Sequence, residues 1–319
     1  MWRRKAPQDA TAGPRNWKDR LFRGWTLAFA VLILVLALVI AWQLFEHSSL
    51  ARSAFGWRFL VTRVWDPVAG QFGALPFIYG TLVTSAIALL IAVPLGLGTA
   101  IFLTELAPPR IAQWLAFLVE LLAAIPSVIY GLVGIFVVVP WVRTVLEPAL
   151  SATLGFLPLF RGAPYGVGFL TAGLVLAVMI VPFITSVSRE VLLAVPRIQR
   201  EAALALGATR WESLAMAVIP YARSGIVGSI LLALARALGE TMAVTMVIGN
   251  RPQIVASLFE PGYTMPAVIA NEFTEATGDL YLHALVEIGL VLFVITVLIN
   301  GIARFLLMRL AVPAGPVKA

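Results

Sequence analysis

Six long runs of apolar residues constrain this chain more than any other feature of its sequence. A helix that crosses the hydrocarbon layer of a membrane needs about 20 mostly apolar residues. The chain is 61% hydrophobic and 12% charged, which excludes an ordinary soluble domain. We therefore predict an all-α integral membrane protein with six transmembrane helices. The runs cover residues 25–45, 80–103, 111–141, 167–187, 222–249 and 284–303.

The third run is too long for one straight crossing and contains Pro126. Proline lacks the backbone donor that a helix needs and clashes with the preceding turn, so it should kink or break this segment. The run could be a cytoplasmic approach helix followed by a span, or one long crossing with a kink. We favour the single kinked crossing.

The distribution of positive charge predicts the orientation of the chain, because Lys and Arg gather in cytoplasmic loops. With the amino terminus inside, sixteen of the 23 Lys and Arg residues are cytoplasmic, six are outside and Arg236 lies within a span. Both termini are therefore predicted to be cytoplasmic. The predicted parts are a basic tail (1–24), a first transmembrane helix (25–46), an extracytoplasmic loop (47–79), a membrane core (80–308) and a second tail (309–319). The basic tail favours contact with anionic membrane lipid over nucleic acid.

Several kinds of chemistry are excluded by what the sequence lacks. It has no cysteine, and its two histidines are far apart, so thiolate metal sites and disulfides are ruled out. It contains no G-x-x-x-x-G-K-[ST] sequence, the loop that holds nucleotide phosphates. No serine nucleophile with an obvious base and no clustered intramembrane carboxylates occur. We expect no enzyme activity and no bound cofactor in this chain.

A polar stretch, EAALALGATRWESLAMAVIPY, interrupts the apolar sequence at residues 201–221. It predicts two short helices that meet at Gly207, where a left-handed helix cap is needed. Thr209 and Glu212 have the spacing of a capping box that opens the second helix. Pro220 precedes the fifth span and is expected to bend the connection. By these features alone the stretch is either a docking element or a linker packed on other loops.

The spacing of Glu201, Ala202, Ala203 and Gly207, with Pro220 further on, resembles the EAA loop of permease subunits in ATP-driven importers. Ala217 and Ile219 stand where that loop usually has Ile and Leu, and both keep an apolar face. The resemblance implies that the loop, residues 188–221, couples this chain to a separate ATPase. Glu201, Ala202, Ala203 and Gly207 would make the coupling contact, and the partner would hold ATP and Mg.

Two charged residues, Arg236 and Glu240, fall within the fifth apolar run. Ionisable groups inside a membrane are costly, so they usually pair or serve a function. Four residues apart on a helix, these two are expected to share a face and to meet. Small residues recur beside them and indicate close helix packing. That stripe is Gly225, Ser229, Ala233, Ala237 and Thr241.

Two hypotheses account for this charged pair. In the first, Arg236 and Glu240 brace the helices and reach Glu120 or Glu287 on other spans. In the second, Arg236 lines an anion pathway, because a guanidinium stays charged and matches phosphate oxygens. Glu240 would then keep the anion from binding too tightly, and Thr241 is a weaker candidate for a hydroxyl contact.

Longer stretches resemble the family of PstC phosphate permease subunits. They are RALGETMAVTMVIGN at 236–250, SLFEPGYTMPAVIANEFTEA at 257–276 and AAIPSVIYGLVGIF at 123–136. The resemblance implies a type I ABC importer fold in the cytoplasmic (inner) membrane and inorganic phosphate as substrate. It also implies three partners: a second permease subunit in a heterodimer, a dimer of ATP-binding subunits and an extracytoplasmic phosphate-binding protein.

Three alternatives remain at this stage. The chain could carry another oxyanion, such as molybdate or sulfate, or be the partner phosphate permease subunit. It could also be a carrier that works alone on an ion gradient. Such carriers often contain inverted repeats, and no persuasive repeat relates the two halves of this sequence.

Overall fold

The computed structural model describes residues 17–310. The regular secondary structure of this part of the chain is helical, apart from one isolated bridge between Asp66 and Gln71. Six helical runs in it are long and apolar enough to cross a membrane, which confirms the all-α prediction. Residues 1–16 and 311–319, which make up most of the two predicted tails, lie outside the described residues. The six runs are Asp19–His47, Leu75–Leu106, Ser127–Leu154, Phe169–Leu193, Arg210–Leu238 and Asp279–Phe305.

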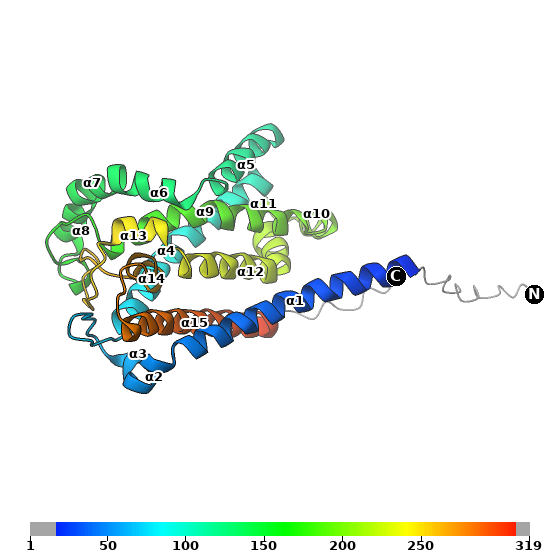
Figure 1. The fold of residues 1–319 in the computed structure, drawn as a ribbon. Coiled ribbons are helices and arrows are strands. Elements are labelled where there is room, and N and C mark those ends of the chain that lie inside the picture. The colour runs from blue at the N-terminus through cyan, green and yellow to red at the C-terminus, as the bar shows by residue number, and fades with distance from the viewer. Residues whose placement is uncertain (1–16, 311–319) are drawn as a thin grey trace, which may run out of the picture.

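The first helix, α1 (Trp17–His47), begins inside the stretch expected to be tail. Two short helices, α2 (Ser49–Phe55) and α3 (Arg58–Val61), follow it, and α4 (Leu75–Ile101) starts before the expected core boundary. Figure 1 shows α2, α3 and α8 at one end of the bundle and α5, α10 and α11 at the other. The start of α1 and the end of α15 (Asp279–Leu310) point toward the same end as α10.

The centre of the bundle is α9 (Phe169–Leu193), because 67% of its most apolar window is buried, against 0% for α1. It packs along α4 and α12 (Ile219–Leu238). Where α9 meets α12, Ser188 Oγ and Ser229 Oγ lie 2.8 Å apart. Ser229, Ala233 and Ala237 are buried, which confirms that most of the small-residue stripe serves close packing.

The fifth span ends earlier than the sequence indicated. Its α-helix, α12, ends at Leu238, and a separate short helix, α13 (Met242–Ile248), follows the break at 239–241. Thr241 therefore lies outside the stripe of α12. The break adjoins the main apolar core, since Ala237 and Ala243 on its two sides both belong to that core.

The third apolar run is divided into two helices, so the single kinked crossing is wrong. α5 (Pro109–Ala123) ends before Pro126, and α6 (Ser127–Val133) begins after it. Pro126 has extended backbone angles, φ −58° and ψ 140°, which no α-helix accommodates. The alternative of a separate helix ahead of the span fits the structure, because the apolar run long enough to cross is Ser127–Leu154.

Three π-helical turns precede prolines in the spans. The turns η2 (Gly134–Val138), η3 (Val142–Leu146) and η5 (Leu214–Val218) come two residues before Pro140, Pro148 and Pro220. Proline has no N–H to give to the preceding turn, and a wider turn lets the helix continue past it. The expected bend at Pro220 is thus a π-turn inside one helical run. The helices after the turns at Pro140 and Pro148 are α7 (Val139–Trp141) and α8 (Glu147–Leu154).

An aromatic cluster joins the segment between α1 and α4 to α14 and to the start of α15. Trp65 Nε1 donates to Glu272 Oε2 (2.8 Å), and the Tyr281 hydroxyl donates to the same oxygen (2.6 Å). Phe72 and Phe77 pack on the Trp65 ring. Glu272 ends α14 (Met265–Glu272), a short helix after the fifth span whose first residues are buried. A short 3-10 helix, η4 (Pro158–Phe160), lies ahead of α9.

Replacing Gly80 with alanine is expected to lower the free energy of unfolding by about 1–3 kcal/mol, the usual cost of overpacking. A Cβ at Gly80 would clash with the Tyr263 carbonyl oxygen, which belongs to the backbone and cannot rotate away. Gly98→Ala on the same helix is the matched control, because nothing lies within 4 Å of its Cβ position. Thermal unfolding of both purified variants, followed by fluorescence-detected size exclusion, compares them. Equal midpoints would contradict the close contact.

Candidate functional site

The polar stretch after the fourth span contains the two helices that its sequence predicted, and the second continues through η5 into α12. They are α10 (Arg197–Ala205) and α11 (Arg210–Ser213). Gly207 has φ +90°, the left-handed conformation that favours glycine. Its N–H donates to the Leu204 carbonyl (3.0 Å), and the Ala208 N–H donates to the Ala203 carbonyl (3.2 Å). This pair of bonds is the Schellman motif, and it confirms Gly207 as the cap of α10.

The second helix opens with the predicted capping box. The Glu212 N–H donates to Thr209 Oγ1 (3.3 Å), and the Thr209 N–H donates to Glu212 Oε2 (2.7 Å). Two local motifs therefore set the turn between α10 and α11.

The loop exposes apolar side chains. Leu206 is 90% exposed and Trp211 is 67% exposed. Glu201, Ala202 and Gly207 are exposed, and Ala203 is half-buried. Exposed apolar groups of this kind mark interaction surfaces. The loop surrounds an open hollow of about 540 Å³ lined by Gln199, Ala202, Ala203, Leu206, Gly207, Ala208, Glu212, Met216 and Ala217.

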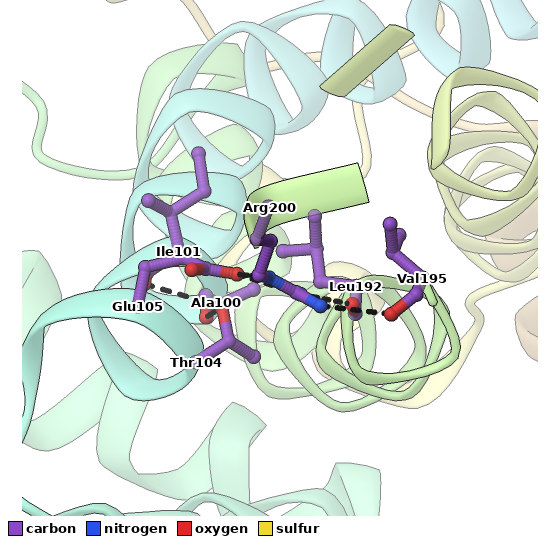
Figure 2. Close-up of polar contacts among 7 residues, drawn as sticks. All are labelled: Ala100, Ile101, Thr104, Glu105, Leu192, Val195 and Arg200. Atoms are coloured by element: carbon purple, nitrogen blue, oxygen red, sulfur yellow. Dashed lines mark hydrogen bonds and ion pairs between the residues drawn. The ribbon is translucent and has the colours of Figure 1, made fainter. Parts of the chain in front are cut away.

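An ion pair that sequence reasoning missed holds α10 against the bundle. Arg200 Nη2 lies 2.8 Å from Oε1 of Glu105. Glu105 belongs to η1 (Phe102–Leu106), the π-turn that ends the second span. The two residues are 95 positions apart, so no local spacing could have indicated this contact. Figure 2 shows the Arg200 side chain between η1 and the end of α9.

Arg236 and Glu240 do not form the predicted ion pair. Among the side chains that the structure describes, the ion pairs are Arg189–Glu190 and Arg200–Glu105, so Glu120 and Glu287 do not pair with Arg236 either. The reason is the helix break, since Glu240 lies beyond the end of α12 and no longer follows Arg236 by one helical turn. The predicted brace between spans is therefore absent from this part of the chain.

Each member of the expected pair has other surroundings. Arg236 is exposed near the end of α12, and its guanidinium carbon lies 6.0 Å from the centre of the Phe183 ring. Glu240 Oε1 accepts a bond from the Ala243 N–H (3.2 Å), so this carboxylate helps to order the start of α13. Thr241 Oγ1 donates to the Gly239 carbonyl (3.3 Å). The guanidinium of Arg236 therefore makes no ion pair with a carboxylate among the described side chains, and its N–H groups remain free of one.

Comparison with known proteins identifies the family. The family described as "Binding-protein-dependent transport system inner membrane component" matches residues 92–312. The PstC phosphate transport system permease protein of Mesorhizobium japonicum is 51% identical over 98% of this chain and 96% of that protein. The chain belongs to the PstC family of permease proteins. The Haemophilus influenzae member is 47% identical over 94% of this chain and 96% of its own length.

Solved structures show the same fold at low sequence identity. A bacterial ABC transporter involved in alginate import aligns with a TM-score of 0.61 at 17% identity, covering 93% of this chain and 99% of that one. The MetNI methionine ABC transporter aligns with a TM-score of 0.53 at 16% identity, covering 74% and 97%. The expected ABC importer permease fold is therefore confirmed.

Proposed function

We propose that this chain is a transmembrane permease subunit of an ATP-driven importer of inorganic phosphate. It forms half of the translocation pathway and does not hydrolyse ATP itself. The observation that carries the proposal is the capped loop α10–α11, with its exposed apolar surface, on a chain whose PstC relatives match almost its whole length. A separate ATPase that binds this loop would hold ATP and Mg.

The complete importer contains three further kinds of subunit. A second permease completes the pathway, a pair of ATP-binding subunits drives it, and an extracytoplasmic binding protein delivers phosphate. The excess of Lys and Arg on one side supports an orientation with both termini in the cytoplasm. The loop α10–α11 lies at the same end of the bundle as the start of α1 (Figure 1), which agrees with contact to a cytoplasmic ATPase. The membrane is the cytoplasmic (inner) membrane.

Transport follows alternating access. When the ATPase pair closes on ATP, it displaces Glu201, Ala202, Ala203 and Gly207, and the spans attached to this loop change orientation. ATP can shift the equilibrium between the inward-open and outward-open conformations only if these two conformations make different contacts with the nucleotide-bound ATPase. Arg236 donates to the phosphate oxygens along the pathway. Glu240 and Thr241 shape the backbone break beside it.

Reconstitution of the purified subunits into liposomes tests the proposal. We expect uptake of phosphate that requires ATP, the binding protein and this chain together. Excess sulfate or molybdate should leave that uptake unchanged. Uptake by this chain alone without nucleotide would overturn the proposal in favour of an ion-gradient carrier. Preferential uptake of sulfate or molybdate would overturn the assignment of phosphate.

A further inference from the structure

We propose that Arg200 is a positioning residue that links the coupling helix α10 to the ends of α4 and α9. Through this link, a displacement of α10 by the ATPase moves the two spans together with it. The inference rests on the proposed function, because it assigns the contact that carries motion from the loop into the membrane. It does not involve the residues expected to touch the ATPase or phosphate.

The Arg200 side chain reaches from α10 to two other elements at once (Figure 2). Toward η1, Nη2 and Nε both donate to Glu105 Oε1, at 2.8 and 3.1 Å. Toward the end of α9, Nη2 also donates to the Leu192 carbonyl (2.8 Å), and Nη1 donates to the Val195 carbonyl (2.8 Å). We refer to these four bonds as the Arg200 link.

The end of α9 explains why an arginine suits this position. The last carbonyl groups of a helix have no partner in the next turn and carry partial negative charge. A planar guanidinium can donate to them and to a carboxylate at the same time, with fixed angles between its donors. A lysine would keep the charge but would present a single ammonium, so it could hold only part of this arrangement.

The other side of the link is also ordered. Glu105 lies in the π-turn η1, which closes with a bond from the Ala107 N–H to the Phe102 carbonyl (2.8 Å). Thr104 Oγ1 of the same turn donates to the Ala100 carbonyl near the end of α4 (3.0 Å). The side chains of Arg200 and Glu105 are 21% and 19% exposed, so water screens this pair less than a surface pair.

An apolar cluster beside the link reinforces the same connection. It joins the end of the second span, the end of α9 and the run from η5 into α12, and its members are Ala100, Leu192, Val195, Leu214, Val218, Ala222 and Ile226. Above it, α4 packs along α9, and α9 packs on α12, the helix that carries Arg236. A contiguous set of packed helices therefore connects α10 to the proposed pathway residue.

The number of phosphate ions transported per ATP hydrolysed tests this role in the reconstituted importer. Arg200→Gln is expected to lower that ratio about tenfold, the factor that corresponds to about 1.4 kcal/mol, while ATP hydrolysis continues. Arg200→Lys should fall between Arg200→Gln and the unchanged chain. Glu105→Gln and the double variant Arg200→Gln/Glu105→Gln complete a double-mutant cycle. The ratio of phosphate to ATP in the double variant should be no lower than in Arg200→Gln. Arg110→Gln, an exposed residue near η1, removes the same charge as a control and should leave the ratio unchanged.

Equal ratios for Arg200→Gln and Arg110→Gln would overturn the proposal while leaving the proposed function intact. Loss of ATP-dependent uptake in the unchanged importer would instead overturn the proposed function.

Because the chain has no cysteine, spin labels can be placed by Leu106→Cys and Arg197→Cys without altering the link. We expect the distance between the labels to stay constant between nucleotide-free and ATP-bound importer. A change of several ångströms would show that α10 moves independently, and this measurement holds even if the Arg200 variants fail to assemble.

Discussion

Replacing Arg236 with glutamine is expected to reduce phosphate uptake about a hundredfold in an importer that still assembles. A hydrogen bond to a charged group contributes about 1.5–3 kcal/mol, so losing one or two of them accounts for an effect of this size. Arg236→Lys keeps the charge but loses the planar donor arrangement, and about a tenfold loss is expected. Initial rates of ATP-dependent uptake in proteoliposomes measure both effects. Because Arg236 is exposed and pairs with no carboxylate in the described chain, its removal should not affect folding.

Glu240→Gln is the informative comparison for this prediction. A glutamine can still accept the bond from the Ala243 N–H through its amide oxygen, so the start of α13 should stay ordered. We expect about a two- to threefold change in uptake, roughly the worth of a weak hydrogen bond. Wild-type uptake rates for Arg236→Gln and Arg236→Lys in assembled importers would contradict a pathway role for Arg236.

Replacing Gly207 with valine is expected to uncouple ATP hydrolysis from phosphate uptake by about tenfold or more. Gly207 has φ +90°, where a β-branched residue is strained by about 1–3 kcal/mol. No atom lies within 4 Å of its Cβ position, so the effect comes from backbone conformation rather than from a clash. The chain should relieve the strain by changing the path from α10 to α11. Membrane insertion should be unaffected, because the residue lies in the exposed loop.

Gly207→Asn is the matched control for this variant. Asparagine tolerates left-handed backbone angles far better than valine does, so most of the coupling should survive. The measurement is again the number of phosphate ions carried per ATP hydrolysed. Tight coupling in the Gly207→Val importer would contradict a role for the α10–α11 geometry in transmitting the motion.

The sequence predicted best those features that depend on local chemistry. The spans follow from hydropathy, and the turn around Gly207, Thr209 and Glu212 follows from capping rules that involve only neighbouring residues. The prediction that Arg236 and Glu240 pair was wrong because it assumed an unbroken helix across Gly239. A glycine inside an apolar run does not by itself show whether a helix ends there, because tertiary packing decides it.

The third span shows the same limit for proline. Pro126 ends α5 outright, whereas Pro220 is accommodated by a π-turn, and nothing in the local sequence distinguishes these outcomes. The Arg200 link could not have been predicted at all, since it depends on how the ends of α4, α9 and α10 come together in space. The parts of the candidate site that depend on long-range packing are therefore those that required a structure.

The peripheral position of α1 has a consequence for how its sequence can change. None of its apolar window is buried by the rest of the described chain, and its neighbours are α15 and α2. Hydrocarbon tails are fluid and accept a leucine, valine or isoleucine equally well, whereas a packed interior requires one shape at each position. Evolution can therefore exchange one aliphatic side chain for another along most of α1, as long as the helix keeps its length and its hydrophobicity. Across related organisms this helix should drift quickly in identity, while α9 keeps nearly the same residues.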